Sequence, residues 1–198
     1  MVKKAILRVF IIVFFIVVGC NHVYAQDSIS HLEFKGIPIN GKLDDFVKKL
    51  EAQGYKVTES LDNIIMMDGQ FTGKDATILV VSTKKSKTVW KVVVKFSEMS
   101  SWSSLKSDYY YYKEMFVKKY GSPTRKYEFF SKPYYEGDGY ELSALRNEKC
   151  YYFSAFETKS GAVYLEISKY KRIEIGYEDE TNSKIMNREK EESVINDI

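Results

Sequence analysis

Residues 43–50 of the chain read Leu-Asp-Asp-Phe-Val-Lys-Lys-Leu, and they contain the clearest helix pattern of the sequence. Its apolar residues recur at the spacing i, i+3, i+4 and i+7, which predicts an amphipathic helix with one face in a core. Two acidic residues stand near the start of this helix and two lysines near its end, as the helix dipole favours. Gly54 follows at a position where helices commonly end.

The middle of this helix occurs twice in the chain. Phe46-Val47-Lys48-Lys49 is repeated as Phe116-Val117-Lys118-Lys119, 70 residues later. The second copy closes a helix predicted from about Ser103 to Tyr120, before Gly121. Strand-like runs follow each helix, at 55–58, 64–67, 78–83 and 89–96 after the first, and at 126–130, 140–145, 150–156, 163–167 and 172–177 after the second.

The order of helix, glycine and about four strands therefore occurs twice, which indicates an internal duplication. We expect an α+β fold of two tandem repeats, residues 26–99 and 100–180, each a helix packed on an antiparallel sheet of about four strands. Along 89–96, Trp90, Val92, Val94 and Phe96 should face the core and Lys91, Val93 and Lys95 the opposite side. Residues 181–198 lose apolar periodicity and are expected to form a polar tail or a frayed helix.

Two turn signatures accompany this layout. Phe34-x-Gly36-Ile37-Pro38-Ile39-x-Gly41 precedes the first helix, and Tyr120-Gly121-x-Pro123 follows the second. In layout, from roughly Leu32 to Asn182, the chain resembles uncharacterised secreted Bacteroidetes proteins thought to share the fold of β-lactamase inhibitor protein. The resemblance implies a tandem helix-plus-sheet fold whose exposed sheet face binds a protein. It assigns no functional residue, and the inhibitor's disulfides have no counterpart in this chain.

Residues 1–25 have the pattern of a secretory leader. Lys3, Lys4 and Arg8 precede an apolar run from Val9 to Cys20. That run has 12 residues, whereas a membrane-spanning helix needs roughly 17 to 25, so we expect export without a membrane span. The protein should therefore be periplasmic or secreted.

Two processing sites compete within this leader. Val23-Tyr24-Ala25 favours cleavage between Ala25 and Gln26 by an ordinary signal peptidase. Val17-Val18-Gly19-Cys20 instead resembles a lipobox, in which Cys20 would carry a lipid and anchor the domain to the envelope. The ordinary site is preferred because the apolar stretch runs up to Cys20 and leaves a short polar spacer before Gln26.

Removing the leader excludes several classes of function. The chain has 30 Lys+Arg and 27 Asp+Glu, and three of the bases are in the leader, so residues 26–198 are balanced and not expected to bind nucleic acid. His31 is then the only histidine, expected to be a solvated surface residue, and Cys150 the only cysteine, expected to be a small buried hydrophobe. We expect no catalytic residues, metal site or cofactor, and no enzyme activity.

Tyrosine is abundant, with 16 in the chain, and it suits both protein interfaces and sugar stacking. On helix and strand spacing, the partner-binding candidates are Tyr110, Tyr111, Tyr134, Tyr135 and Tyr164. The main hypothesis is a non-enzymatic module that binds a protein of the cell envelope. A carbohydrate-binding protein is the alternative. A hydrolase with a carboxylate pair, such as Asp44-Asp45 or Glu178-Asp179-Glu180, is a third.

Overall fold

The computed structural model describes residues 30–198. The expectations for the leader, including cleavage at Ala25 and Gln26 or lipidation of Cys20, lie outside the described residues. Within residues 30–198, no helix is both long and apolar enough to cross a membrane.

The described chain is an α+β structure with four helices and antiparallel sheets. Its elements, in chain order, are β1 (Glu33–Phe34), β2 (Ile37–Pro38), α1 (Leu43–Glu51), β3 (Lys56–Ser60), β4 (Ile64–Phe71), β5 (Lys74–Ser82), β6 (Val89–Phe96), α2 (Trp102–Tyr120), β7 (Arg125–Phe130), α3 (Glu141–Arg146), β8 (Cys150–Thr158), β9 (Gly161–Ser168), β10 (Arg172–Asp179) and α4 (Glu180–Asp197).

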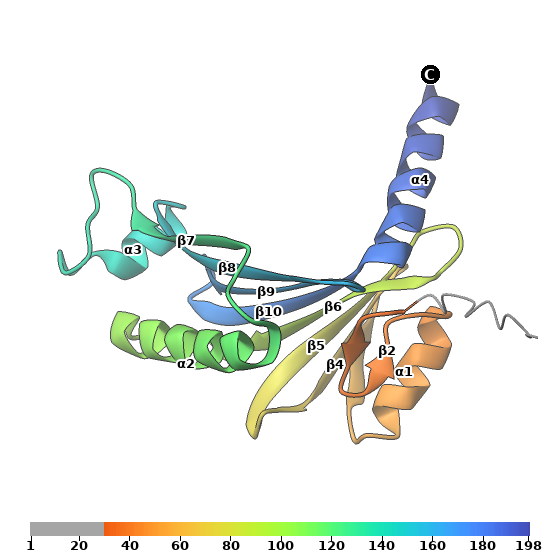
Figure 1. Ribbon diagram of the computed structural model, residues 1–198, viewed down its shortest axis with the longest axis horizontal. Helices are drawn as coiled ribbons and strands as arrows, with labels where there is room; N and C mark the ends of the chain where they lie inside the picture. Colours follow the sequence, from red (N-terminus) through yellow and green to blue (C-terminus); the bar gives the residue numbers. More distant parts are fainter. Residues whose placement is uncertain (1–29) are drawn as a thin grey trace, which may run out of the picture.

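Eight strands form one continuous antiparallel sheet in the order β3-β4-β5-β6-β10-β9-β8-β7. The meander β3–β6 follows α1, and the meander β7–β10 follows α2. The two meanders join where β6 pairs with β10, the last strand of the chain. Helices α1 and α2 lie on the same side of the sheet, whereas α4 leaves it on the other side (Figure 1). The short hairpin β1–β2 lies beside α1.

One hydrophobic core fills the space between the sheet and the helices. From α1 it takes the four apolar residues of the predicted stripe, all buried, and from α2 it takes Leu105, Tyr109, Tyr112 and Phe116. The sheet contributes alternate residues, so that Val92, Val94 and Phe96 of β6 are buried against it. Trp90, expected on the same face, is only partly buried and lines a groove with residues of α4, because the register of β5 and β6 shifts between Val81 and Ser82. The side of the sheet with Lys91, Val93 and Lys95 faces away from these two helices.

Both copies of the repeated tetrapeptide lie in helices. Phe46 and Phe116 are buried, while Val47 is buried and Val117 is exposed. Each helix is followed by a glycine with a positive φ, Gly54 at 93° and Gly121 at 86°. Glycine adopts such a φ without a Cβ clash, which explains why these residues terminate the helical segments.

The strand expected at 140–145 is wrong. These residues contribute to α3, a short helix whose Ala144 and Leu145 are buried. Glu, Leu, Ala and Arg all favour helix, and the acidic Glu141 starts it while Arg146 ends it, in agreement with the dipole. The C-terminal segment expected as a polar tail or frayed helix is the 18-residue helix α4, mostly exposed.

Candidate binding face

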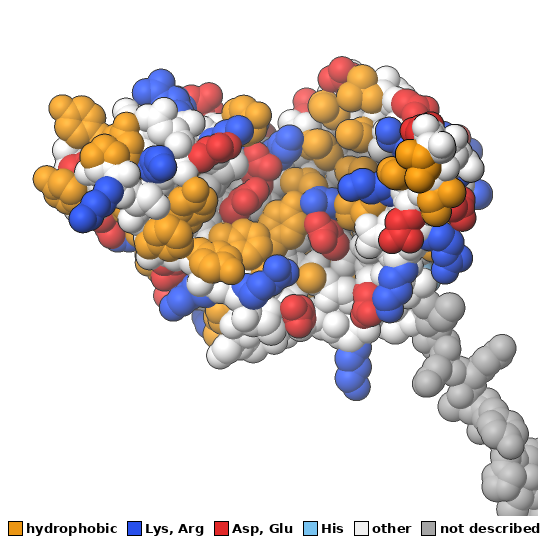
Figure 2. Space-filling view, turned by 90° about the horizontal axis from the view of Figure 1, so that it is seen from above, with side chains coloured by type: hydrophobic (Ala, Val, Ile, Leu, Met, Phe, Trp, Pro, Cys, Tyr) orange, Lys and Arg blue, Asp and Glu red, His pale blue; other side chains and the backbone are white. Residues whose placement is uncertain are grey.

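We call the side of the sheet away from α1 and α2 the open face. Strand register places one residue of each strand in a straight row across it, in the order Tyr127, Phe153, Glu166, Glu174, Lys95, Thr77, Asp68 and Lys56. Figure 2 looks onto this face, where hydrophobic side chains form a band in a hollow between two raised parts of the surface, with charged side chains along it. The row is aromatic at one end and charged over the rest.

The aromatic part of the open face comes from β7 and β8. Tyr127 and Phe153 are cross-strand partners with ring centroids 6.1 Å apart, and Phe129 stacks on Tyr151 at 5.0 Å. Tyr127, Phe129 and Tyr151 are 51%, 45% and 42% exposed, so these rings present apolar area to solvent. Exposed aromatic rings held by their neighbours are the type of surface that contributes most to protein interfaces.

Tyr164 lies at the centre of the open face. Its ring stacks on Phe153 with centroids 5.9 Å apart, and it covers Gly176 so closely that a Cβ there would come within 2.0 Å of the ring. Lys91 Nζ lies 5.0 Å from the ring centroid and forms an ion pair with Glu178 at 2.7 Å. Burial raises the pKa of Tyr164 despite the nearby lysine, so the side chain is a neutral phenol near neutral pH.

Glu166 and Glu174 stand directly opposite each other on β9 and β10. Glu174 is only 9% exposed. Burial, and after it the charge of Glu174, raise the pKa of Glu166, while Lys91 acts in the opposite direction. Two carboxylates in directly opposed cross-strand positions repel each other.

The acidic pair and the aromatic residues line one groove of about 600 Å³. Tyr127, Tyr151 and Phe153 contribute to its lining from the β7–β8 side, and Glu166 and Glu174 from β9 and β10. Tyr170, in the turn between β9 and β10, lines it as well and is 57% exposed. This groove is the candidate site.

The tyrosines predicted from the sequence do not gather on one surface. Tyr164 lies on the open face, as expected from its alternation with the buried Val163 and Leu165. Tyr110 and Tyr111 are on α2, which lies on the other side of the sheet. Tyr134 and Tyr135 are in the loop between β7 and α3, where the Tyr134 hydroxyl accepts a hydrogen bond from Asn147 Nδ2 at 2.8 Å.

The exposed aromatics of β7 and β8 were missed by the sequence reasoning. Strand alternation was the available signal, because Tyr151 and Phe153 alternate with the buried Tyr152 and Ser154. Tyr110, in contrast, belongs to a polar cluster between α2 and β7. There Glu128 pairs with Lys113 and accepts hydrogen bonds from the Tyr109 and Tyr110 hydroxyls at 3.2 and 3.5 Å. This cluster fixes α2 on the sheet.

The carboxylates considered for hydrolysis have structural roles. Asp44 and Asp45 are in the first turn of α1. Glu178 is paired with Lys91, and Asp179, which is fully buried, is the N-cap of α4. Asp179 accepts hydrogen bonds from the backbone N–H groups of Asn182 and Leu32, both at 2.9 Å.

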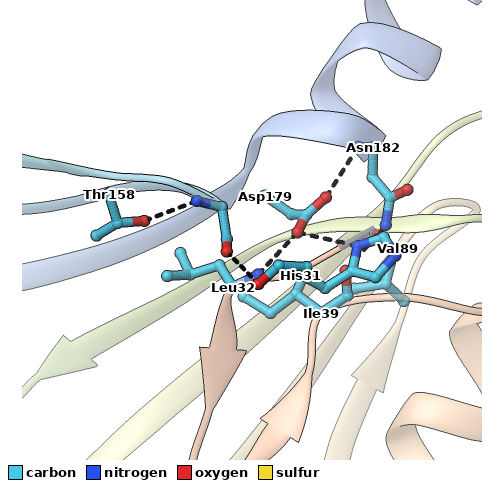
Figure 3. A network of polar contacts seen from close by, with 9 residues as sticks. His31, Leu32, Ile39, Val89, Thr158, Asp179 and Asn182 are labelled. Atoms are coloured by element: carbon cyan, nitrogen blue, oxygen red, sulfur yellow. Dashed lines mark hydrogen bonds and ion pairs between the residues drawn. The ribbon is translucent and has the colours of Figure 1, made fainter. Parts of the chain in front are cut away.

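Asp179 also contacts the only described histidine (Figure 3). His31 Nδ1 lies 3.1 Å from Asp179 Oδ2, and its side chain is 18% exposed, so the expectation of a solvated histidine is wrong. Asn182 completes the network by donating through Nδ2 to the carbonyls of Ile39 and Val89 at 2.9 and 2.7 Å. The network connects the start of α4 to the N-terminal segment and to β6.

Cys150 is buried at the start of β8 with a free thiol. Burial, with the charges of Glu136 and Glu141, raises its pKa to about 12, so the thiol stays protonated near neutral pH. Within residues 30–198, no three His, Cys, Asp or Glu side chains are grouped so that they could hold a metal ion. No protein-family model, curated protein or solved structure matches the chain.

Proposed function

We propose that the protein is a non-enzymatic module that binds another protein of the cell envelope through the open face. One observation carries this proposal: three exposed aromatic rings, Tyr127, Phe129 and Tyr151, lie on the neighbouring strands β7 and β8 at one end of the sheet, and Tyr127 and Tyr151 line the groove. Strand residues lose little freedom on binding, and the stacked neighbours already hold the rings in place. The open face is therefore suited to binding the surface of a partner protein that is already folded.

The experiment is affinity capture from the native host, using the full chain with a tag after Ile198, which is 99% exposed. A double variant, Tyr127→Ala with Tyr151→Ala, removes apolar area from the open face. The matched control replaces Tyr135 and Tyr140, which are 66% and 64% exposed, by alanine.

A partner protein should be captured by the wild type and by the control, and lost from the open-face variant. Equal capture by all three proteins, or no protein recovered after crosslinking, would overturn the proposal. The aromatic rings also suit sugar stacking, so a glycan array is probed with the same three proteins. Binding to a glycan that depends on Tyr127 and Tyr151, without a protein partner, would favour the carbohydrate-binding alternative.

We also propose that the two meanders are tandem repeats of one ancestral unit, with the fold of β-lactamase inhibitor protein. Three features support this: each begins with a helix carrying the same tetrapeptide, each helix is followed by a glycine with positive φ, and the strand order reads outward from the β6–β10 junction in the same sequence on both sides. The insertion of α3 after β7 distinguishes the second unit.

We also propose that the protein is exported from the cytoplasm. The leader supports a periplasmic or secreted protein that begins at Gln26, with a lipid anchor on Cys20 as the alternative. Intact-mass measurement of the protein from its native host separates the two. A mass that begins at Gln26 supports cleavage after Ala25, and a diacylglycerol-modified Cys20 would replace that assignment by the lipoprotein.

A further inference from the structure

The groove on the open face contains two carboxylates without partners. Within residues 30–198, neither Glu166 nor Glu174 forms a hydrogen bond or an ion pair through its side chain. Glu174 is nine-tenths buried and lines the groove. Their carboxylate oxygens are not among the buried polar atoms that lack a partner, so they reach the solvent of the groove, where a cation from outside the molecule can pair with them.

In the described part of the chain, the cations around the groove form no ion pair with either glutamate. Arg125 and Lys169 line the groove, and Lys169 is held by Glu148 at 2.7 Å. Lys91 is held by Glu178 at 2.7 Å. Lys95 stands opposite Glu174 on β6, and Arg172 precedes it by two residues on β10, yet neither forms an ion pair with it. The direct cross-strand neighbours of Glu166 are Phe153 and Glu174, and neither is a cation.

Aromatic residues adjoin the acidic pair on the β8 side. Phe153 is the direct cross-strand neighbour of Glu166, and Tyr127 follows it in the row. Tyr151 and Tyr170 line the same groove. A cation placed between these rings and the two carboxylates would contact π-faces and negative charges together, and both attract it.

We propose that this groove binds an arginine side chain presented by the partner protein, an inference that rests on the proposed function. The guanidinium is planar and carries five donors, so it can bridge two neighbouring carboxylates while one face stacks on an aromatic ring. A lysine ammonium is a compact, strongly hydrated charge that offers neither the stacking nor the fork geometry. The groove volume of about 600 Å³ accommodates such a side chain.

The test uses N-acetyl-arginine amide as the probe, added to isotope-labelled full-length protein and followed in amide NMR spectra. Saturable shifts at millimolar probe are expected for β8, β9 and β10 around the groove. N-acetyl-lysine amide should bind several-fold more weakly, and the neutral isostere N-acetyl-citrulline amide should cause no such shifts.

Glu166→Gln and Glu174→Gln are expected to weaken arginine-amide binding by about tenfold each, since each removes one charge-assisted contact. The matched control is Glu51→Gln, at the exposed end of α1 on the other side of the sheet, which should bind like the wild type. Unchanged spectra outside the groove show that each variant is folded.

Shifts that persist in the double glutamine variant, or that map away from the groove, would overturn the proposal. So would shifts produced equally by CaCl2 and abolished by EDTA, which would indicate a metal site. Partner capture that depends on Tyr127 and Tyr151 but not on Glu166 and Glu174 would leave the proposed function standing and remove the arginine. If both sets of variants capture the partner as well as the wild type does, the proposed function itself is overturned.

Discussion

Substitution of Asn182 tests the buried polar network at the start of α4. It is 3% exposed, and its Nδ2 group donates to the carbonyls of Ile39 and Val89 at 2.9 and 2.7 Å. Asn182→Asp keeps the shape of the side chain but replaces both N–H donors by an oxygen acceptor. Two carbonyl oxygens would then face a carboxylate, next to the buried Asp179.

The expected loss in the free energy of unfolding follows from the hydrogen bonds that are removed. Asn182→Ala leaves two buried carbonyls without these donors and should lower the free energy of unfolding by about 2–4 kcal/mol. Asn182→Asp adds repulsion from Asp179, on the order of 3 kcal/mol for two unit charges at the roughly 6 Å typical of residues three apart and an effective dielectric constant of about 20. A total near 5–7 kcal/mol is comparable to the whole stability of many domains, so the aspartate variant should be largely unfolded at pH 7.

The loss should depend on pH in a definite direction. Burial, the two carbonyls and Asp179 disfavour the charged form, so the pKa of the introduced carboxyl is raised in the folded protein. Stability is then lost as the pH rises through that raised pKa, and it returns when the carboxyl is protonated and can donate one hydrogen bond. The difference in the free energy of unfolding between Asn182→Asp and Asn182→Ala should therefore be smaller at pH 5 than at pH 7.

Urea unfolding followed by the fluorescence of Trp90 and Trp102 measures these differences. Asn187→Asp is the matched control, because Asn187 is exposed on the same helix. Comparing the two Asn182 variants at one pH cancels the titration of the groups that they share. If Asn182→Asp unfolds at the same urea concentration as Asn187→Asp, or if its deficit relative to Asn182→Ala is unchanged at pH 5, the reasoning fails.

Three further predictions follow from single residues. Glu166→Gln should stabilise the protein at pH 7 by up to about 1 kcal/mol, because the raised pKa of Glu166 costs stability as the pH rises above the ordinary 4.5, and the gain should vanish near pH 4 in the same urea assay. Cys150 should react with iodoacetamide at least about a hundredfold more slowly in the native protein than in urea, measured by mass, because its pKa is about 12. Gly161→Ala should cost more than about 2 kcal/mol, read from the urea midpoint, because its Cβ would lie 2.0 Å from the backbone oxygen of Glu178; an alanine variant as stable as the wild type would contradict this.

Most helices and strands could be predicted from the sequence because their periodicity is strong. The stripe of α1 and the alternation of β6 each follow from one short window, and β6 spans Val89–Phe96 as predicted. Residues 140–145 are too few to separate a helix turn from a strand, and α3 was missed for that reason. The partly buried position of His31 depends on Asp179, 148 residues away, which no local pattern reveals.

The candidate site depends on register, which the sequence leaves open. Alternation places Tyr164 and Glu166 on one face of β9, but the residue opposite Glu166 depends on the turn between β9 and β10. In that turn Lys171 has a φ of 57°, an uncommon conformation for a lysine. The residue types of the turn therefore do not predict its backbone conformation. A slip of one residue would bring Glu174 to the core side and remove the acidic pair.

The junction of β6 with β10 determines what a ligand on the open face can contact. It places Lys95, from the meander that follows α1, opposite Glu174, from the meander that follows α2. The two aromatic residues of the row, Tyr127 and Phe153, lie on the second side of this junction, and the polar Thr77, Asp68 and Lys56 on the first. A partner that covers the whole row must therefore supply an apolar surface for Tyr127 and Phe153, a cation for the acidic pair, and hydrogen-bonding groups beyond Lys95. A partner limited to the aromatic half would leave Glu174 buried further and still unpaired, which charge desolvation opposes.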